Sequence, residues 1–402
     1  MGSFFRMLLV YAAEDRLLLQ IREKLDRWLG LLVRKLAFRK EKIVPEKVFV
    51  MTYDDQFNCN PKYIVQELIR RKLPLDIVWA VPENGDIPYD RFPPEVRLVP
   101  RKSFNMMREM ASAHIWIDNA LDCVWYGMPK KKGQVFLNTW HGSLGIKRLA
   151  GNRHWRRSAA RCNKLADYFI ANSSFEENVY KSSFWPDVPV LKFGHARNDI
   201  LFDPGMRIKM REKVMNALGI ADKDAKLFLY APTFRDSMTM DWFDADLEKV
   251  RESLESRFGG EWVILVRMHF KDRLLHSRNS CFNDHVINAS QIDDMQELLA
   301  AVDAGMSDYS SWVFDFLLTG RPVFLYTPDI DKYDHDRGFY YPLASTPFSI
   351  SRNMRELETA VREFDEDEYR RKVKAFLTEK GCYEDGHASE RIADFIADLI
   401  QK

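Results

Sequence analysis

The sequence lacks the short motifs that mark the commonest nucleotide- and metal-binding sites. Its 18 glycines form no GxGxxG and no Walker A pattern, so NAD binding and P-loop ATP hydrolysis are disfavoured. Its 5 cysteines are scattered without a CxxC pair, which argues against a zinc site or a disulfide framework and suits a reducing compartment. No cluster of side chains has the spacing of metal ligands, and we expect no cofactor.

Long apolar runs and a charge excess are also missing. No apolar stretch is long enough to span a bilayer, and Arg6, Glu14 and Arg16 interrupt the first apolar run, so we expect no secretory signal. With 60 Lys and Arg against 59 Asp and Glu, the net charge is +1 and favours no class of partner. The 402 residues have a globular composition, and this length favours two domains.

Residues 1–40 form a basic amphipathic segment. Its apolar side chains recur at helical spacing, at Leu18, Ile21, Leu25, Trp28, Leu29, Leu32 and Leu36. Its basic side chains surround them, at Arg22, Lys24, Arg27, Arg34, Lys35, Arg39 and Lys40. Such a helix can lie in the interface of an anionic membrane, and we expect that contact here. The alternative is a helix that packs on the protein's own core.

Strands then alternate with helices, a pattern typical of parallel doubly wound sheets. The expected strands are residues 48–51, 75–81, 96–99, 114–118, 134–138, 168–171, 190–193, 226–230, 262–267, 286–288 and 323–326. Asn60 is expected to cap the first helix. Asp203-Pro204-Gly205 interrupts the alternation, so we divide the chain into residues 41–205 and 206–402, the latter with a helical tail. The predicted architecture is α/β, with two Rossmann-like domains facing each other across a cleft.

The strand at 134–138 ends in Thr139-Trp140-His141-Gly142-Ser143. Ligands of parallel α/β sheets bind at the carboxyl ends of strands, so His141 is well placed to act as a general base. The alternative is a structural histidine whose ring is satisfied by backbone hydrogen bonds.

A basic run without acidic residues follows this histidine. It contains Lys147, Arg148, Arg153, Arg156, Arg157, Arg161 and Lys164. Such a run suits a polyanionic partner, such as lipid phosphate or a phosphate polymer, whereas a solvated helix face usually mixes both signs. Nucleic acid is disfavoured because no nucleic-acid-binding motif accompanies the run.

Polar side chains also follow the strands of the second half. Thr233 and Arg235 follow one strand, Arg267 and His269 another, and Asp308, Ser310 and Ser311 precede a predicted helix. Arginines and a helix start together suit a pyrophosphate, to which His269 would donate a hydrogen bond or a proton. The alternative for the serines is an ordinary helix cap.

At these residues the sequence resembles the CDP-glycerol glycerophosphotransferase family. The motifs that carry the resemblance, in order, are Asn60-Pro61-Lys62-Tyr63, Thr139-Trp140-His141-Gly142, Ala171-Asn172-Ser173, Arg197-Asn198-Asp199, Tyr230-Ala231-Pro232-Thr233-Phe234-Arg235, Arg267-Met268-His269, Ser307-Asp308-Tyr309-Ser310-Ser311 with Phe314-Asp315, and Arg337-Gly338-Phe339. They cover roughly residues 47 to 345. Each motif is weak alone, whereas the ordered set is specific.

The resemblance implies a GT-B fold with an acceptor domain at 41–205 and a nucleotide-donor domain at 206–402. It implies transfer of glycerol phosphate from CDP-glycerol to a hydroxyl of a lipid-linked or polymeric acceptor, releasing CMP, at the cytoplasmic face of the membrane. By resemblance His141 and His269 are catalytic. The donor-binding residues would be Thr233, Arg235, Arg267, Asp308, Ser310, Ser311 and Asp315, and the acceptor-binding residues Lys147, Arg148, Arg153, Arg156 and Arg157.

The polymer would be teichoic-acid-like or capsular. Two other interpretations stay open at this point. One is a transferase that uses CDP-ribitol or a nucleotide sugar, since a single hydroxyl decides donor choice where a site is built to bind it. The other is a non-catalytic module that binds polyanions or membranes.

Overall fold

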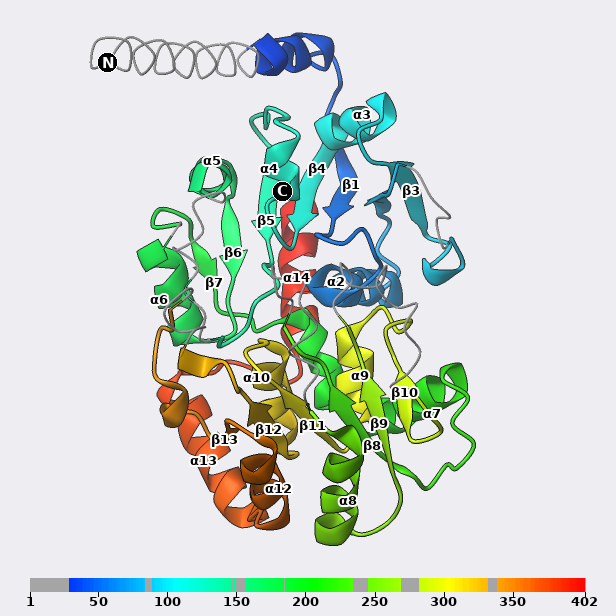
Figure 1. Cartoon of the computed structure of the whole chain (residues 1–402). Helices are drawn as coiled ribbons and strands as arrows, with labels where there is room; N and C mark the ends of the chain where they lie inside the picture. Colours follow the sequence, from blue (N-terminus) through cyan, green and yellow to red (C-terminus); the bar gives the residue numbers. More distant parts are fainter. Residues whose placement is uncertain are drawn as a thin grey trace, which may run out of the picture.

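The computed structural model describes residues 29–83, 89–145, 148, 156–183, 185–233, 245–268, 282–331 and 338–401. These residues form two parallel sheets, of 7 strands in the first half of the chain and 6 in the second (Figure 1). The predicted α/β class with parallel sheets is therefore confirmed.

The first sheet has the strand order β3-β2-β1-β4-β5-β6-β7. Its strands are β1 (Val44–Met51), β2 (Asp76–Val81), β3 (Val96–Pro100), β4 (Ala113–Asp118), β5 (Val135–Asn138), β6 (Tyr168–Ile170) and β7 (Val190–Leu191). Helical segments connect them, namely α2 (Cys59–Arg70), η1 (Tyr89–Arg91), α3 (Phe104–Ser112), α4 (Asp122–Trp125), α5 (Arg156–Leu165) and α6 (Ser174–Ser183). The central strands are apolar along their length because helices bury both faces of a parallel sheet.

The second sheet has the order β10-β9-β8-β11-β12-β13. Its strands are β8 (Lys226–Tyr230), β9 (Trp262–Val266), β10 (Val286–Asn288), β11 (Ala304–Ser307), β12 (Val323–Tyr326) and β13 (Ser349–Ser351). The helical segments of this half are α7 (Pro204–Ala217), α8 (Leu247–Phe258), α9 (Met295–Ala301), α10 (Trp312–Phe316), η5 (Leu317–Thr319), η6 (Leu343–Ser345), α12 (Met354–Arg362) and α13 (Glu366–Glu379). Strand β9 is buried at every residue.

The C-terminal helix α14 (Ala388–Gln401) crosses back to the first half, where it packs beside α2 (Figure 1). Its Ile392 and Ile396 are buried in the same core as Val48 of β1. The helical tail is thus divided, since α12 packs against α8 in the second half while α14 covers the first sheet. The two halves are therefore joined by the tail as well as by η2 (Ala196–Leu201).

Where the chain was divided, Asp203 caps α7, accepting hydrogen bonds from the backbone N–H groups of Gly205 and Met206, with Pro204 in the first turn. One helix start differs from the sequence prediction. Asn60 is not a cap, because α2 already begins at Cys59 and its N-cap residue is Asn58. The side chain of Asn60 instead contacts the loop that follows β5.

A buried ion-pair cluster also ties the two halves together. Lys62 Nζ of α2 lies 2.6 Å from Asp294 Oδ2 and 2.7 Å from Glu297 Oε1, beside α9. The hydroxyl of Tyr63 donates to the same Asp294 oxygen over 2.9 Å. Breaking one partner of a buried pair leaves an uncompensated charge, so this cluster favours one relative placement of the halves.

Candidate active site

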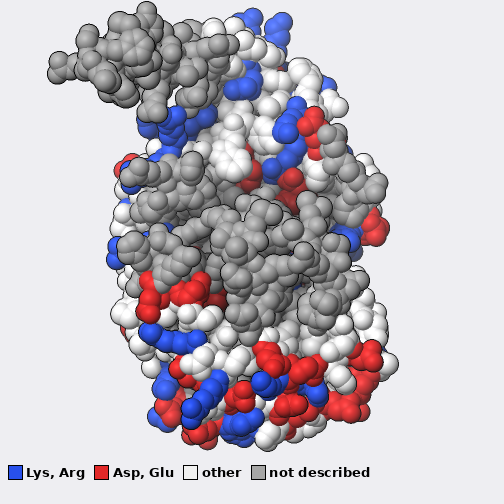
Figure 2. Space-filling model, viewed as in Figure 1, with Lys and Arg blue, Asp and Glu red and all other residues white. Residues whose placement is uncertain are grey.

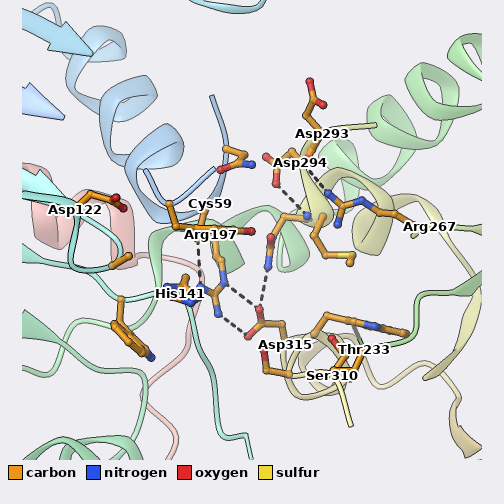
Figure 3. Close-up of a pocket in the computed structure, with 18 of the residues that line it drawn as sticks. Cys59, Asp122, His141, Arg197, Thr233, Arg267, Asp293, Asp294, Ser310 and Asp315 are labelled. Atoms are coloured by element: carbon orange, nitrogen blue, oxygen red, sulfur yellow. Dashed lines mark hydrogen bonds and ion pairs between the residues drawn. The ribbon is translucent and has the colours of Figure 1, made fainter. Parts of the chain in front are cut away.

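One cavity of about 610 Å³ is bordered by residues of both halves (Figure 3). Its lining includes the predicted site residues His141, Thr233, Arg267, Ser310, Ser311 and Asp315. His141 follows β5 of the first sheet, whereas Arg267 follows β9 of the second. The prediction that these strand-end residues converge is therefore confirmed, and the volume suits a nucleotide-sized ligand.

The ring of His141 has a defined orientation. Its Nδ1 lies 2.6 Å from the backbone oxygen of Asn119, which only accepts, so Nδ1 carries the proton and Nε2 keeps the lone pair. The rings of Tyr53 and Trp140 pack against it, with centroids 4.8 and 4.6 Å away. The pKa of His141 is lowered to about 4, chiefly by burial and in part by the Arg197 charge, while the Asn119 contact opposes the shift. His141 is accordingly neutral near pH 7 and able to accept a proton.

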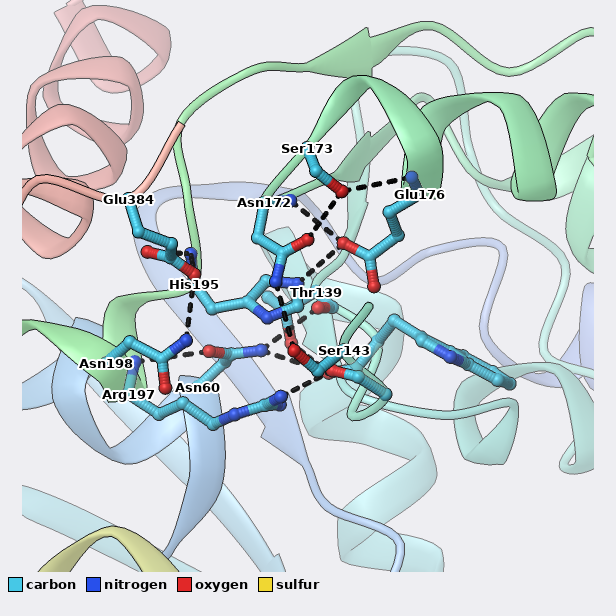
Figure 4. Close-up of polar contacts among 12 residues, drawn as sticks. Asn60, Thr139, Ser143, Asn172, Ser173, Glu176, His195, Arg197, Asn198 and Glu384 are labelled. Atoms are coloured by element: carbon cyan, nitrogen blue, oxygen red, sulfur yellow. Dashed lines mark hydrogen bonds and ion pairs between the residues drawn. The ribbon is translucent and has the colours of Figure 1, made fainter. Parts of the chain in front are cut away.

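The turn that carries His141 is held in an uncommon backbone conformation. Trp140 has a φ of 50°, in the left-handed region that non-glycine residues seldom adopt. The Asn138 side chain accepts from the Trp140 N–H over 2.8 Å. Asn60 Nδ2 donates to the backbone oxygens of Thr139 and Trp140, both at 3.1 Å (Figure 4). Two asparagines thus fix the turn that positions the base.

Arg197 connects this turn to the second half. Its backbone N–H donates to Asn60 Oδ1 over 3.2 Å, and its guanidinium donates to the Gly142 oxygen and to Asp315 Oδ2, the latter at 2.9 Å. Burial alone would lower the pKa of Arg197, but the Asp315 carboxylate raises it overall. Gln296 also donates to Asp315, over 2.9 Å. Asp315, expected to bind the donor, borders the cavity but has its carboxylate engaged in this link between the halves.

Arg267 borders the cavity from the second half. Its Nη2 donates to the Asp293 backbone oxygen over 2.6 Å and its Nε to the Ile292 oxygen over 3.2 Å. These two bonds hold the guanidinium plane at the wall of the cavity (Figure 3). The planar guanidinium geometry of an arginine at this wall is well suited to binding an anion in the cavity.

Asp308 supports the site from behind the cavity wall. Its Oδ1 accepts from the backbone N–H of Thr233 over 2.8 Å and from its hydroxyl over 2.7 Å. Asp308 therefore fixes the loop that places Thr233 at the cavity. Ser311 is the N-cap residue of α10, as predicted, but its side chain makes no hydrogen bond to the helix start. The Ser310 and Ser311 side chains border the cavity instead.

Other predicted site residues are either not described by the structure or not part of the described cavity lining. His269, Arg235, Lys147 and Arg153 lie outside the described residues. Arg148 is exposed and donates two hydrogen bonds to the second half of the chain. Its backbone N–H donates to the Gly338 oxygen over 3.1 Å, and its Nε donates to the Phe339 oxygen over 2.9 Å. Arg156 and Arg157 are exposed in the first turn of α5.

A buried polar network underlies the Gly142-Ser143 segment (Figure 4). His195 Nε2 lies 3.0 Å from Glu176 Oε2, which also accepts from the Asn172 N–H over 2.8 Å. Asn172 Nδ2 in turn donates to Ser143 Oγ over 3.2 Å. The Glu384 carboxylate accepts from the His195 N–H, and burial raises its pKa to about 7 although the His195 charge lowers it. This network supports the loop beyond His141 rather than bordering the cavity.

Sequence reasoning left several residues that position or border the site unassigned, among them Asn60, Arg197 and Tyr53. Asn60 and Arg197 stood within recognised motifs, but the motifs alone gave no hint that they bond to one another. Tyr53 follows β1 at the same sheet edge as His141, and its place after a strand was the one available signal.

Comparisons with known proteins agree on one family. A family model described as "CDP-Glycerol:Poly(glycerophosphate) glycerophosphotransferase" matches residues 33–398. The chain is 26% identical over 387 residues to the teichoic acid poly(glycerol phosphate) polymerase of Staphylococcus epidermidis, covering 90% of this chain and 52% of that one. It is 26% identical over 404 residues to the Bacillus spizizenii protein of the same name, covering 95% of this chain and 99% of that one.

Among solved structures, the wall teichoic acid polymerase TagF superposes with a TM-score of 0.79 at 26% sequence identity, covering 95% of this chain and 98% of that one. The chain spans about half the length of the S. epidermidis relative, 52%, and nearly all of the B. spizizenii relative, 99%.

Proposed function

Since the chain belongs to the CDP-glycerol:poly(glycerophosphate) glycerophosphotransferase family, we propose that it moves glycerol phosphate from CDP-glycerol to a hydroxyl of a lipid-linked or polymeric acceptor, releasing CMP. The product would be a teichoic-acid-like or capsular polymer. Two parallel sheets whose strand ends border one cavity support a GT-B assignment, with the acceptor on the first domain and the nucleotide on the second.

The observation that carries the proposal is the meeting of His141 and Arg267 in one cavity. His141 Nε2 takes the proton of the acceptor hydroxyl as its oxygen attacks the phosphorus that bears the glycerol. The bond from that phosphorus to the CMP oxygen breaks, and CMP leaves with the electron pair. Arg267, with the Ser310 and Ser311 hydroxyls, stabilises the charge on the pyrophosphate. His269, outside the described residues, remains the proposed second catalytic residue.

The proposal extends to the basic residues and to the membrane surface. Lys147, Arg148, Arg153, Arg156 and Arg157 would hold the phosphates of the acceptor, and Arg235, Thr233, Asp308 and Asp315 would bind the donor or fix its loops. No helix within the described residues combines the length and the apolarity needed to cross a membrane. The start of the described chain instead offers a face suited to the surface of a membrane.

Residues 29–37 are helical, and Arg34 Nε anchors this helix to the first half by donating to the Gly127 oxygen over 3.1 Å. Its Leu29, Leu32 and Leu36 are 47%, 37% and 54% exposed, so these side chains do not pack on the protein's own core. Lys and Arg side chains gather beside this segment on the face shown in Figure 2. Apolar side chains flanked by cations suit an anionic lipid surface at the cytoplasmic face of the membrane.

Sedimentation with vesicles tests the membrane contact. The Leu29→Asp/Leu36→Asp variant should lose binding to phosphatidylglycerol vesicles. Ile208→Asp, which changes a side chain of α7 that is 63% exposed, is the control and should bind like wild type. Equal binding of all three proteins would contradict the proposed contact.

CMP release from CDP-glycerol tests the reaction. Wild type should release CMP in the presence of a glycerol-phosphate acceptor, and His141→Ala should reduce the rate by roughly a hundredfold to ten-thousandfold. Unchanged turnover in the variant would refute the role of His141. Release from CDP-ribitol but not CDP-glycerol would keep the reaction class and change the donor. Binding of the acceptor without turnover of any donor would favour a non-catalytic module.

A further inference from the structure

Trp125 is an exposed aromatic residue at the edge of the cavity. It is the last residue of α4, its side chain is 60% exposed, and it borders the cavity that contains His141. Its indole N–H donates to Ser158 Oγ of α5 over 3.0 Å, so the exposed ring has a fixed position. A single exposed apolar side chain is ordinary on a protein surface, but a fixed indole at the mouth of a cavity suits ligand contact.

The helix to which Trp125 is tied carries charge of one sign. Every charged residue of α5 is basic, namely Arg156, Arg157, Arg161 and Lys164. Arg156 and Arg157 are exposed in the first turn, beside Ser158. Helices α4 and α5 pack against each other (Figure 1). The indole therefore lies between the cavity and a helix whose charged residues are all basic.

We propose that Trp125, Arg156 and Arg157 form an acceptor surface, which binds the units of a phosphodiester-linked polyol behind the one that enters the cavity. This inference rests on the proposed function, and it gives the acceptor a route over α4 and α5. The flat indole face packs on the C–H edges of a polyol, while the guanidinium groups bind the phosphates between units. In such a polymer the polyol units alternate with phosphates, so the indole and the two arginines each have a partner along it.

The dependence of KM on acceptor length tests the surface. Trp125→Ala should raise the KM for an acceptor of several glycerol-phosphate units by about tenfold, which corresponds to about 1.4 kcal/mol. The KM for a one-unit acceptor and for CDP-glycerol should rise far less, because the proposed contact is with the units behind the one that enters the cavity. Trp125→Phe keeps a ring and should recover most of the affinity. Tyr89→Ala, which removes another exposed aromatic ring, 65% exposed and away from the cavity lining, is the matched control.

Equal rises in KM for short and long acceptors would indicate a structural role and overturn the proposal, as would no change for either. Calorimetric binding of poly(glycerol phosphate) to the full chain separates this inference from the proposed function. If wild type released no CMP from any donor, the proposed function would fail, yet a tenfold weaker Kd for Trp125→Ala would still support the surface. Loss of binding to phosphatidylglycerol vesicles with an unchanged polymer Kd would instead assign Trp125 to the membrane.

Discussion

The two sides of the cavity differ in chemistry. On the first side, His141 lies against the rings of Tyr53 and Trp140, and its pKa is lowered to about 4 because it is buried. On the second side, Arg267 and the Ser310 hydroxyl offer a cation and a hydrogen-bond donor. The first side is thus arranged around a neutral proton acceptor, and the second around donors for an anion.

Two opposed chemical requirements are therefore met in one cavity. A general base must hold a lone pair, so it benefits from surroundings that penalise its protonated form. A phosphate needs positive charge and hydrogen-bond donors, and such donors beside the base would hydrogen-bond to its lone pair. Placing each requirement on a separate sheet, with Arg197 and Asp315 joining the two, allows both to be satisfied at once.

After the loss of the base in His141→Ala, the largest expected effect comes from removing the charge of the second side. Arg267→Ala should lower the rate of CMP release by about a hundredfold to a thousandfold, since a preorganised donor to the developing phosphate charge is lost. Arg267→Lys should recover little of this, because an ammonium cannot bond to the Ile292 and Asp293 oxygens in one plane. Steady-state kinetics with CDP-glycerol as the varied substrate measures both variants.

Arg91→Ala is the matched control for Arg267. Arg91 pairs with the side chain of Asp293, so it contacts the same segment as Arg267, but it is 49% exposed and does not border the cavity. Its loss should leave the rate within about twofold of wild type, as is usual for exposed ion pairs. Equal losses in the two variants would mean that Arg267 acts only by holding residues 292–293, and the contrast between the two sides would fail.

Much of the fold was predictable, because buried parallel strands are apolar along their whole length. The strands at 226–230, 286–288 and 323–326 were predicted with the observed limits. Strand β13, Ser349–Ser351, was not predicted because two of its three residues are serines at the edge of the sheet. Asp203-Pro204, which was used only to divide the chain, also starts helix α7, and such a pair is typical of a helix start.

For the site, the sequence predicted only which loops come together. Strand ends place His141, Arg267 and Ser310 at facing sheet edges, and the cavity contains all three. The partners of the polar groups were not predictable, since they depend on side chains far apart in the sequence. Asp315 shows this, because its carboxylate binds Arg197, 118 positions away, and so links the halves.

The smallest expected effect is on the pH dependence of the first side. With its pKa near 4, His141 stays neutral down to about pH 5, so kcat/KM for the acceptor should be nearly flat from pH 8 to pH 6. A histidine with the ordinary pKa of about 6.5 would retain about one quarter of the activity at pH 6. Lowering the pH also lowers stability. The unfolded chain takes up this proton below about pH 6.5, whereas the folded chain does so only near pH 4, so the free energy of unfolding decreases between these two values.

Comparing kcat with kcat/KM sharpens this prediction, because they report different states of the enzyme. The kcat/KM profile follows the free enzyme, in which burial and the Arg197 charge keep the pKa of His141 low. The kcat profile follows the complex, in which the negative pyrophosphate stabilises protonated His141 and raises its pKa. Tyr53→Ala should raise the kcat/KM inflection toward about 6.5 by exposing the ring, from which Tyr53 lies 4.8 Å away. An inflection near 6.5 in wild type, unmoved by this substitution, would show that the aromatic surroundings do not set the protonation of the base.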